Sequence, residues 1–257
     1  DGLMLGHAVK LGAKVLGVDP AANLAPLAKE RGVEVLTAYF NPETARELRN
    51  GRGPAAAIST TNTFNHIDNL HDFMEAVDIL LDEAGVFVIE VPWGKKILET
   101  DQFDNIYHEH MSELSLLSIV RLGEATGFDV VDVTKLPVHG GSMRVFMRKA
   151  ALGQKPAPIV GSMIAEEEAA GLTRRESFEA FAARVNKLGE DLKDLLKRLK
   201  ADGKVVAGYG APAKGTTLTT YFQIGPELVS FLVDRNPLKQ GLYSPGMHIP
   251  IYGAEAV

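Results

Sequence analysis

The sequence of 257 residues contains no cysteine, which excludes disulfide bonds, thiolate nucleophiles and cysteine-built zinc sites within it. It also lacks any apolar run approaching the roughly 20 residues of a membrane span, and it lacks a charged signal-peptide start. No cluster of Lys and Arg stands out, and a formal net charge of −6 gives no attraction to phosphate backbones. We therefore expect a cytoplasmic protein with no nucleic-acid or membrane partner.

The composition is typical of a soluble globular protein. Hydrophobic residues make up 46% of the chain, charged residues 23% and aromatic residues 7%. This balance supplies a buried core and excludes disorder and collagen-like repeats. Because the length exceeds what one compact unit usually needs, we expect a domain over 1–150, a linker with a long helix over 151–202, and a second domain over 203–257.

The first 92 residues alternate short apolar runs with helical patterns, which is the signature of a parallel sheet built from βα units. The expected strands are 14–18, 33–36, 55–59 and 86–91, and the expected helices are 22–31, 42–50 and 70–81. A helix over 113–126 and strands over 129–133 and 142–147 end this α/β domain. The chain opens on a helical pattern with no strand before it, so we interpret it as an interior fragment.

The second half begins with a linker at Pro156 and Pro158. Thr173-Arg-Arg-Glu176 has the form of a capping box and predicts the start of a long helix. The apolar residues of this helix alternate steps of three and four, so it could pack on a partner helix or, as we favour, on its own domain. A further βα unit follows, with strands at 205–210 and 229–233 and a helix at 212–221.

Several polar residues lie where the carboxyl ends of parallel strands should meet, which is the edge where open α/β folds bind ligands. Asp19 ends the first strand, where its carboxylate could accept hydrogen bonds from both ribose hydroxyls of a nucleotide. It could equally be an ordinary helix N-cap beside Pro20. The loop from Thr60 through Asn62 and the pair Asp1-Gly2 belong to the same edge.

Gly208-Tyr209-Gly210-Ala211-Pro212-Ala213 fits the pattern G-x-G-x-x-A between a strand and a helix, and Asp234 ends the next strand. Taken alone, this pattern favours an NAD site: the glycines would let backbone N–H groups approach a pyrophosphate, and Lys214 would add a positive charge. The alternative is that the glycines only permit close packing.

Tyr107-His108-Glu109-His110 places four polar or titratable side chains in a row in an irregular segment, which suits an active-site loop. A metal site is an alternative, with His108 and His110 joined by His139 or Glu90. A solvated loop is another.

The segment from Pro137 to Arg144 contains Gly140-Gly141 between two expected strands, which predicts a hairpin. Its polar residues His139, Ser142 and Arg144 could also bind an anionic substrate. Both roles are compatible, because a turn between strands can carry binding residues.

Together these segments resemble the sugar C-methyltransferases, which use S-adenosylmethionine (SAM) to methylate a carbon of nucleotide-linked keto-deoxysugars. YHEHMSELSL at 107–116 is similar to the family's active-site stretch, and LPVHGGSMRV at 136–145 to the hairpin after it. GYGAPAKG and VDRNPLKQGLYSPGMHIPI, within 208–251, resemble its C-terminal domain. GVDPAANLA at 17–25 and Asp1-Gly2 are weaker matches, the latter to the family's loop around SAM.

The resemblance implies a Rossmann-like class I SAM methyltransferase domain and a second, partial Rossmann-like domain that closes over a nucleotide sugar. It implies an N-terminal zinc-binding module and a first strand that this segment lacks. It further implies SAM-binding residues Asp1, Gly2, Asp19 and Asn62, and substrate-binding residues His139, Ser142, Arg144, Tyr209 and Lys214.

The implied reaction is methyl transfer to a carbon next to a keto group, through an enolate. By the resemblance, His110 is the general base, Glu109 orients or polarises the site, and Tyr107 donates to the developing oxyanion. An NAD-dependent oxidoreductase using Gly208, Gly210 and Asp234, and a non-catalytic nucleotide-sugar binding protein, are the two other hypotheses.

Overall fold

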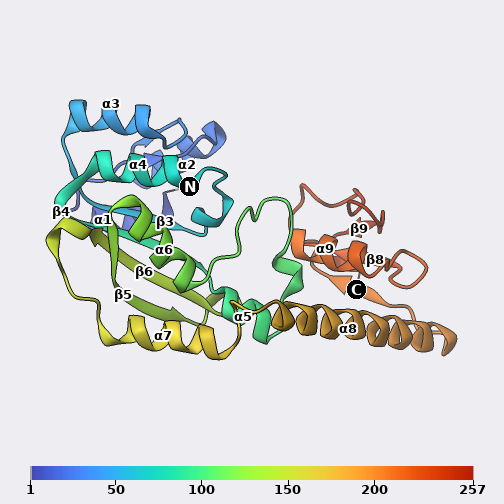
Figure 1. Cartoon of the computed structure of the whole chain (residues 1–257). Coiled ribbons are helices and arrows are strands. Elements are labelled where there is room, and N and C mark those ends of the chain that lie inside the picture. The colour runs from blue at the N-terminus through green and yellow to red at the C-terminus, as the bar shows by residue number, and fades with distance from the viewer. Residues whose placement is uncertain (1, 257) are drawn as a thin grey trace.

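Two lobes share the long helix α8 (Arg175–Ala201) in the computed structural model, which describes residues 2–256 (Figure 1). The first lobe holds every element up to α7 (Pro158–Ala169), and the second holds the elements after α8. Each lobe has its own cluster of buried apolar side chains. Within the described residues, no helix is long and apolar enough to cross a membrane.

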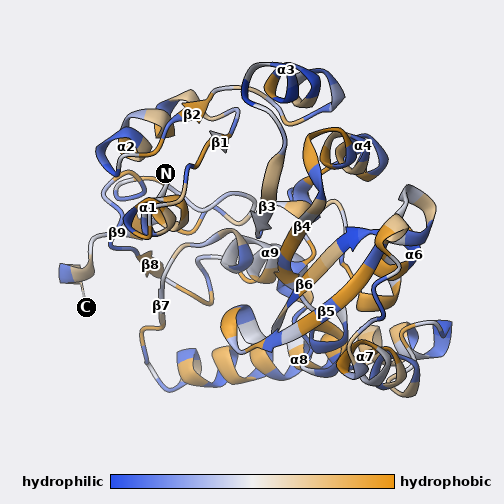
Figure 2. Cartoon of the chain, turned by 90° about the vertical axis from the view of Figure 1, so that its left-hand side faces the viewer, coloured by the Kyte–Doolittle hydropathy of each residue, from blue (hydrophilic) through white to orange (hydrophobic). Residues whose placement is uncertain are grey.

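The main sheet of the first lobe has the strand order β3-β4-β6-β5. Its strands are β3 (Ala55–Thr61), β4 (Leu81–Pro92), β5 (Phe128–Leu136) and β6 (Ser142–Lys149). β3 and β4 are parallel, whereas β6 runs antiparallel to both β4 and β5. The antiparallel pairing of β5 with β6 confirms the predicted hairpin. Long hydrophobic stretches on β4 and β5 are visible in Figure 2 and supply much of the core.

The expected strand over 14–18 forms only at its last two residues. β1 (Gly17–Val18) pairs in parallel with β2 (Val35–Leu36), and this two-stranded sheet is not hydrogen-bonded to β3. The prediction of one continuous parallel sheet was therefore wrong. Among the described residues the ladder has two paired positions, Gly17 with Val35 and Val18 with Leu36.

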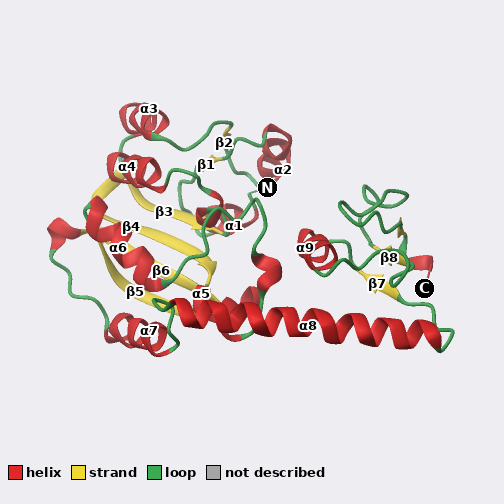
Figure 3. Cartoon of the chain, turned by 45° about the vertical axis from the view of Figure 1, so that its right-hand side comes forward, coloured by secondary structure: helices red, strands yellow, loops and turns green. Residues whose placement is uncertain are grey.

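The helices of the first lobe are α1 (Leu3–Lys10), α2 (Ala25–Glu30), α3 (Pro42–Arg52), α4 (Leu70–Leu80), α5 (Gly94–Glu99), α6 (Leu116–Thr126) and α7. Polar side chains set several of their starts. Asn41 caps α3 by accepting from the Thr44 amide, and Ser115 caps α6 in a capping box with Ser118. α6 therefore begins three residues after the expected Glu113. α6 and α7 pack on β5, and α3 packs on α4 (Figure 3).

The second lobe is a three-stranded parallel sheet with one helix. Its elements are β7 (Ala207–Tyr209), α9 (Ala213–Tyr221), β8 (Phe231–Val233) and β9 (Ile251–Tyr252). α8 buries Val185 and Leu196 in the core of this lobe, which confirms the packing-helix interpretation. Gly189 makes the approach possible, since a Cβ there would lie 2.3 Å from Cδ1 of Phe222.

The predicted capping box at the start of α8 is absent. The N-cap residue is Arg174, not Thr173, and it makes no side-chain capping bond. The Arg174 amide instead bonds to the carbonyl of Gly171. The helix therefore starts one residue later than expected, after a turn that this bond closes.

The segment after α5 anchors the second lobe to the first. The ring of Phe103, in the 3₁₀ turn Phe103–Asn105, lies 4.8 Å from the ring of Phe222 and 5.5 Å from that of Tyr221. Arg184 of α8 bonds to Asp101 and to the carbonyl of Leu98. These contacts hold the segment that precedes residues 107–110 against the second lobe.

Candidate active site

The carboxyl end of β3 carries buried polar atoms that have no partner in the protein. Asn62, just after β3, has a φ of 51°, and its amide donates to the carbonyl of Glu90 at 2.8 Å. The Oδ1 atom of Asn62 and the Oγ1 atom of Thr60 are buried without a hydrogen bond. Because buried polar atoms are nearly always paired, these two suit a bound ligand that supplies donors.

His139 joins this edge from the hairpin between β5 and β6. Its Nε2 atom lies 3.3 Å from Nδ2 of Asn62, and its φ of 52° is in the left-handed region. Residues with bulky side chains rarely adopt this backbone conformation, and those that do are found mainly at functional sites. The structure thus brings together Asn62 and His139, which the sequence assigned to cofactor and substrate respectively.

The loop after β3 also reaches the segment 107–110. The Ser112 amide donates to the carbonyl of Asn65 at 3.2 Å, and the His66 ring lies 5.0 Å from the His110 ring at an angle of 77°. The ring of Tyr107 lies on the same imidazole, with centroids 4.3 Å apart. His110 is consequently held between two rings, with only 8% of its side chain exposed.

Burial lowers the pKa of His110, and the nearby charges of His66 and Lys214 lower it further. The backbone of Asn105, by a hydrogen bond, and the charge of Glu109 act in the opposite direction. The Nδ1 atom is buried without a hydrogen bond. A neutral imidazole in this state is ready to accept a proton at neutral pH.

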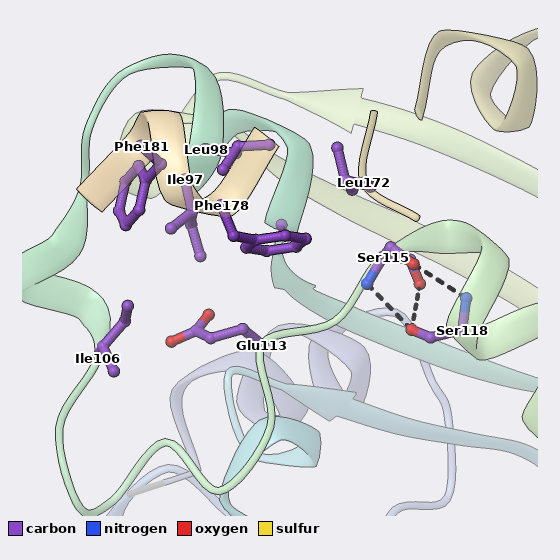
Figure 4. A pocket seen from close by; sticks show the side chains of 10 residues that line it. Ile97, Leu98, Ile106, Glu113, Ser115, Ser118, Leu172, Phe178 and Phe181 are labelled. Atoms are coloured by element: carbon purple, nitrogen blue, oxygen red, sulfur yellow. Dashed lines mark hydrogen bonds between the residues drawn. The ribbon is translucent and has the colours of Figure 1, made fainter. Parts of the chain in front are cut away.

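Glu113 supplies the carboxyl group nearest to His110, with Oε1 lying 3.4 Å from Nδ1. Its side chain is 26% exposed. Burial raises the pKa of Glu113 to about 7, against the opposing charge of Lys214. The side chain projects into a cavity of about 290 Å³ (Figure 4), whose apolar lining residues are Ile97, Leu98, Ile106, Leu172, Phe178 and Phe181.

Lys214 comes from the second lobe, at the start of α9, yet its charge acts on both His110 and Glu113. The candidate site therefore draws on both lobes. The sequence analysis did not identify His66 or Glu113. In the sequence, Glu113 could have been found only from its position three residues after His110. His66 could have been found only from its position in the loop that follows β3.

The other three side chains of the segment 107–110 lie in different environments. Burial raises the pKa of Tyr107, as do the charges of Glu109, Glu113 and Asp104, so its phenol keeps a proton to donate. The side chains of His108 and Glu109 are 89% and 58% exposed. Among the described residues, no three His, Asp or Glu side chains converge as metal ligands.

The remaining predicted substrate residues occupy different environments. Arg144 donates twice to Oε2 of Glu90, at 2.8 and 2.6 Å. Ser142 is buried, and its hydroxyl donates to the Val138 carbonyl. Tyr209 is exposed at the end of β7. Their roles toward a substrate stay predictions.

The predicted cofactor residues lie along the amino-terminal part of the first lobe. Asp19 is half-buried and accepts from the Ala21 amide through Oδ1 at 2.8 Å, which leaves Oδ2 for a ligand. Gly2 is the N-cap of α1 with a φ of 74°, and a Cβ there would lie 2.9 Å from Ala28. Asp1 lies outside the described residues. With the unpaired Oδ1 of Asn62, this edge offers two oxygen atoms that could accept hydrogen bonds from a ligand such as SAM.

The second lobe is less suited to a dinucleotide than its motif indicates. Both carboxylate oxygens of Asp234 accept backbone amides, from Ala211 and Asn236, each at 2.8 Å. These two bonds lower the pKa of Asp234, that to Asn236 most. A Cβ on Gly208 would lie 2.5 Å from Leu232. The carboxylate thus holds the turn, and this glycine permits close packing.

Comparisons with known proteins identify the family of the chain. A family model described as a methyltransferase domain matches residues 1–133, and one described as a C-methyltransferase C-terminal domain matches residues 137–257. The C-methyltransferase NovU of Streptomyces niveus is 41% identical over 244 residues, which is 95% of this chain and 58% of NovU. The chain thus spans less than two thirds of that relative.

The solved structures that match this chain have lower sequence identity to it than NovU has. A SAM-dependent methyltransferase from Anabaena variabilis is 14% identical with a TM-score of 0.46, over 58% of this chain and 73% of that chain. The 1,6-didemethyltoxoflavin-N1-methyltransferase of Burkholderia thailandensis is 20% identical with a TM-score of 0.44, over 58% of this chain and 66% of that chain. SAM is the cofactor of the family whose model matches the first lobe. The chain therefore belongs to the methyltransferase family, as a methyltransferase domain followed by a C-methyltransferase C-terminal domain.

Proposed function

We propose that the full-length protein is a C-methyltransferase that uses SAM to methylate a carbon next to a keto group of a nucleotide-linked deoxysugar. The observation that carries this proposal is the state of His110. It is a buried imidazole with a lowered pKa, held between two rings where the lobes meet. Carbon methylation needs such a base, because an unactivated carbon is not a nucleophile.

SAM, when bound, supplies an already electrophilic methyl group. Asp19 and Asn62 would hold it, Asp19 through its unoccupied oxygen and Asn62 through its unpaired Oδ1. His110 then removes the proton from the substrate carbon next to the keto group. Tyr107, whose phenol stays protonated, donates a hydrogen bond to the oxygen that gains negative charge. The enolate carbon would be the nucleophile to which bound SAM supplies its methyl group, with S-adenosylhomocysteine as the leaving group.

Features of the second lobe support a nucleotide diphosphate on the substrate. Lys214 is a cation beside His110, and it lies in the first turn of α9, where free backbone amides favour anions. Tyr209 offers an exposed aromatic ring at the end of the neighbouring strand. Sites between two lobes are common for ligands of this size.

The cofactor assignment predicts that Asp19→Ala weakens binding of S-adenosylhomocysteine. We expect a loss of about 1–3 kcal/mol, because a charged acceptor of hydroxyl groups is removed. Asp19→Asn is the matched variant, since its side-chain oxygen can still accept from the Ala21 amide while the charge is lost. Calorimetry on the full-length protein measures both. Equal binding by wild type and D19A would contradict the assignment.

The reaction itself is tested by incubating the full-length protein with SAM and a thymidine diphosphate 4-keto-6-deoxysugar. We expect a product carrying one added methyl group on carbon, located by NMR. Transfer to oxygen or nitrogen would contradict the proposal. Turnover with NAD that Gly210→Val abolishes would favour the oxidoreductase hypothesis instead.

A further inference from the structure

We propose that Glu113 is a positioning residue for His110: its carboxylate holds the ring proton on Nδ1, so that the other ring nitrogen is free to take the substrate proton. This inference rests on the proposed role of His110. It concerns a carboxyl group that the segment Tyr107-His108-Glu109-His110 does not contain. Glu113 contributes no contact to the substrate in this proposal.

The geometry singles out Glu113 among the nearby carboxyl groups. Its Oε1 lies 3.4 Å from Nδ1 of His110, within ion-pair distance, and Nδ1 makes no hydrogen bond to any described residue. Glu109, by contrast, is 58% exposed and lies 4.0 Å from Nε2 of His108. Because Nδ1 is buried, a substrate can reach the ring only through its other nitrogen.

The rings around His110 restrict how it can turn. Tyr107 lies along one face at a centroid distance of 4.3 Å and His66 meets it edge-on at 5.0 Å. A ring held in this way keeps Nδ1 close to Oε1 of Glu113. Fixing the orientation and tautomer of a catalytic imidazole is what a carboxylate partner does in other enzymes.

Two acceptors compete for the ring proton. One is the carboxyl group of Glu113 at Nδ1, and the other is the backbone of Asn105, whose hydrogen bond favours the protonated ring. A carboxylate is a stronger acceptor than a neutral carbonyl. The ionised Glu113 therefore draws the proton to Nδ1, whereas the protonated Glu113 can only donate to Nδ1 and leaves the proton of the ring on the other nitrogen.

The environment of Glu113 places the titration of its carboxyl group near neutral pH. The cavity that Glu113 enters is lined by apolar side chains together with Ser115 and Ser118, and no other charged side chain lines it. This burial raises the pKa of Glu113 to about 7, with Lys214 opposing it. The charged or titratable groups facing the pair are His66, Lys214, Glu109, Tyr107 and Asp104.

The proton balance is simple. With Glu113 ionised, the free nitrogen of His110 accepts the proton from the substrate carbon, and the carbon keeps the electron pair as an enolate. The resulting imidazolium is stabilised by the carboxylate at Nδ1. With Glu113 protonated, that nitrogen already carries a proton. The active form is therefore lost as pH falls through about 7.

The direct test is NMR of the imidazole nitrogens of His110 in the full-length protein, assigned by comparison with His110→Asn. In the wild type we expect a coupled titration with one step near pH 7 and mainly the Nδ1–H form above it. In Glu113→Gln the amide cannot ionise, so that step should vanish. An unchanged tautomer and titration in E113Q would overturn the proposal, whether or not methyl transfer is observed.

A second arm measures methyl transfer against pH. Glu113→Gln should lower kcat by at least about 10-fold with little change in KM, since loss of a tautomer-fixing carboxylate lowers kcat by up to ~10⁴ elsewhere. Glu113→Asp should recover part of kcat. Glu124→Gln, the same substitution at an exposed ion pair on α6, is the matched control. Wild-type kcat and pH profile in E113Q would contradict the role of Glu113 and leave that of His110 intact.

Discussion

Replacing His110 with Asn in the full-length protein should lower the rate of methyl transfer by about 10²–10⁴-fold, the usual contribution of a general base. The Asn side chain is polar and of similar size, but its amide cannot accept the proton from a carbon acid. Binding of S-adenosylhomocysteine should be unchanged, because Asp19 and Asn62, the residues assigned to it, contact other parts of the first lobe. The readouts are initial rates and calorimetry.

His108→Asn provides the matched comparison for that variant. It makes the same substitution two residues away, at a side chain that is 89% exposed, and it should retain most of the rate. Exchange of the substrate hydrogen with deuterated water is a sharper measurement, since it reports enolate formation without methyl transfer. H110N should lose the exchange as well. Undiminished transfer in H110N would exclude the base role, and a stoichiometric metal lost with His108 or His110 would support the metal-site hypothesis.

Local patterns predicted most of the first lobe. The helix over 42–50 appears as α3 (Pro42–Arg52) and the strand over 86–91 lies inside β4. The strand is a nearly continuous apolar run, and the helix is bounded by Asn41, which caps it, and by Gly53. The pairing of β1 with β2 alone was not predictable in this way. Strand neighbours are chosen by packing between distant segments, which periodicity does not report.

The candidate site, like the fold, was only partly predictable from local sequence patterns. The segment Tyr107-His108-Glu109-His110 is visible as a run of polar residues, but its members separate in the structure, with His108 and Glu109 in solvent and His110 buried. The ring of His110 contacts that of His66, from the loop after β3, and pairs with Glu113, three residues further along the chain. The charge of Lys214, from the other lobe, also acts on it. Only the tertiary fold brings residues more than 100 positions apart to one ring.

Glu167 is the second residue whose replacement should have a large effect, here on stability. Its side chain is buried in α7, with the residue 1% exposed. It accepts from Nε1 of Trp93 at 2.5 Å and from the amides of Leu116 and Leu117 at 2.6 and 2.9 Å. The carboxylate thus occupies the amino end of α6 and joins α7 to the segment after β4.

Glu167→Ala should lower the free energy of unfolding of the first lobe by about 3–5 kcal/mol, because it leaves two buried donors and one half-buried donor without an acceptor. At roughly 2–4 °C per kcal/mol for a unit of this size, the melting temperature should fall by about 6–20 °C. Trp93 is the single tryptophan of the chain, so its fluorescence reports this lobe directly. Glu167→Gln should fall in between, since one oxygen remains as an acceptor.

Glu166→Ala is the matched control, one position away on the same helix. The Glu166 side chain is 36% exposed, pairs with Lys135 at the surface and lies 4.0 Å from Lys95, which also pairs with Glu99, so its loss should cost no more than about 1 kcal/mol. The two variants remove the same chemical group from the same turn of α7. If E167A and E166A melted together, the buried carboxylate would contribute nothing beyond a surface ion pair. A large gap between them would locate the attachment of α7 to the methyltransferase domain in the three hydrogen bonds of Glu167.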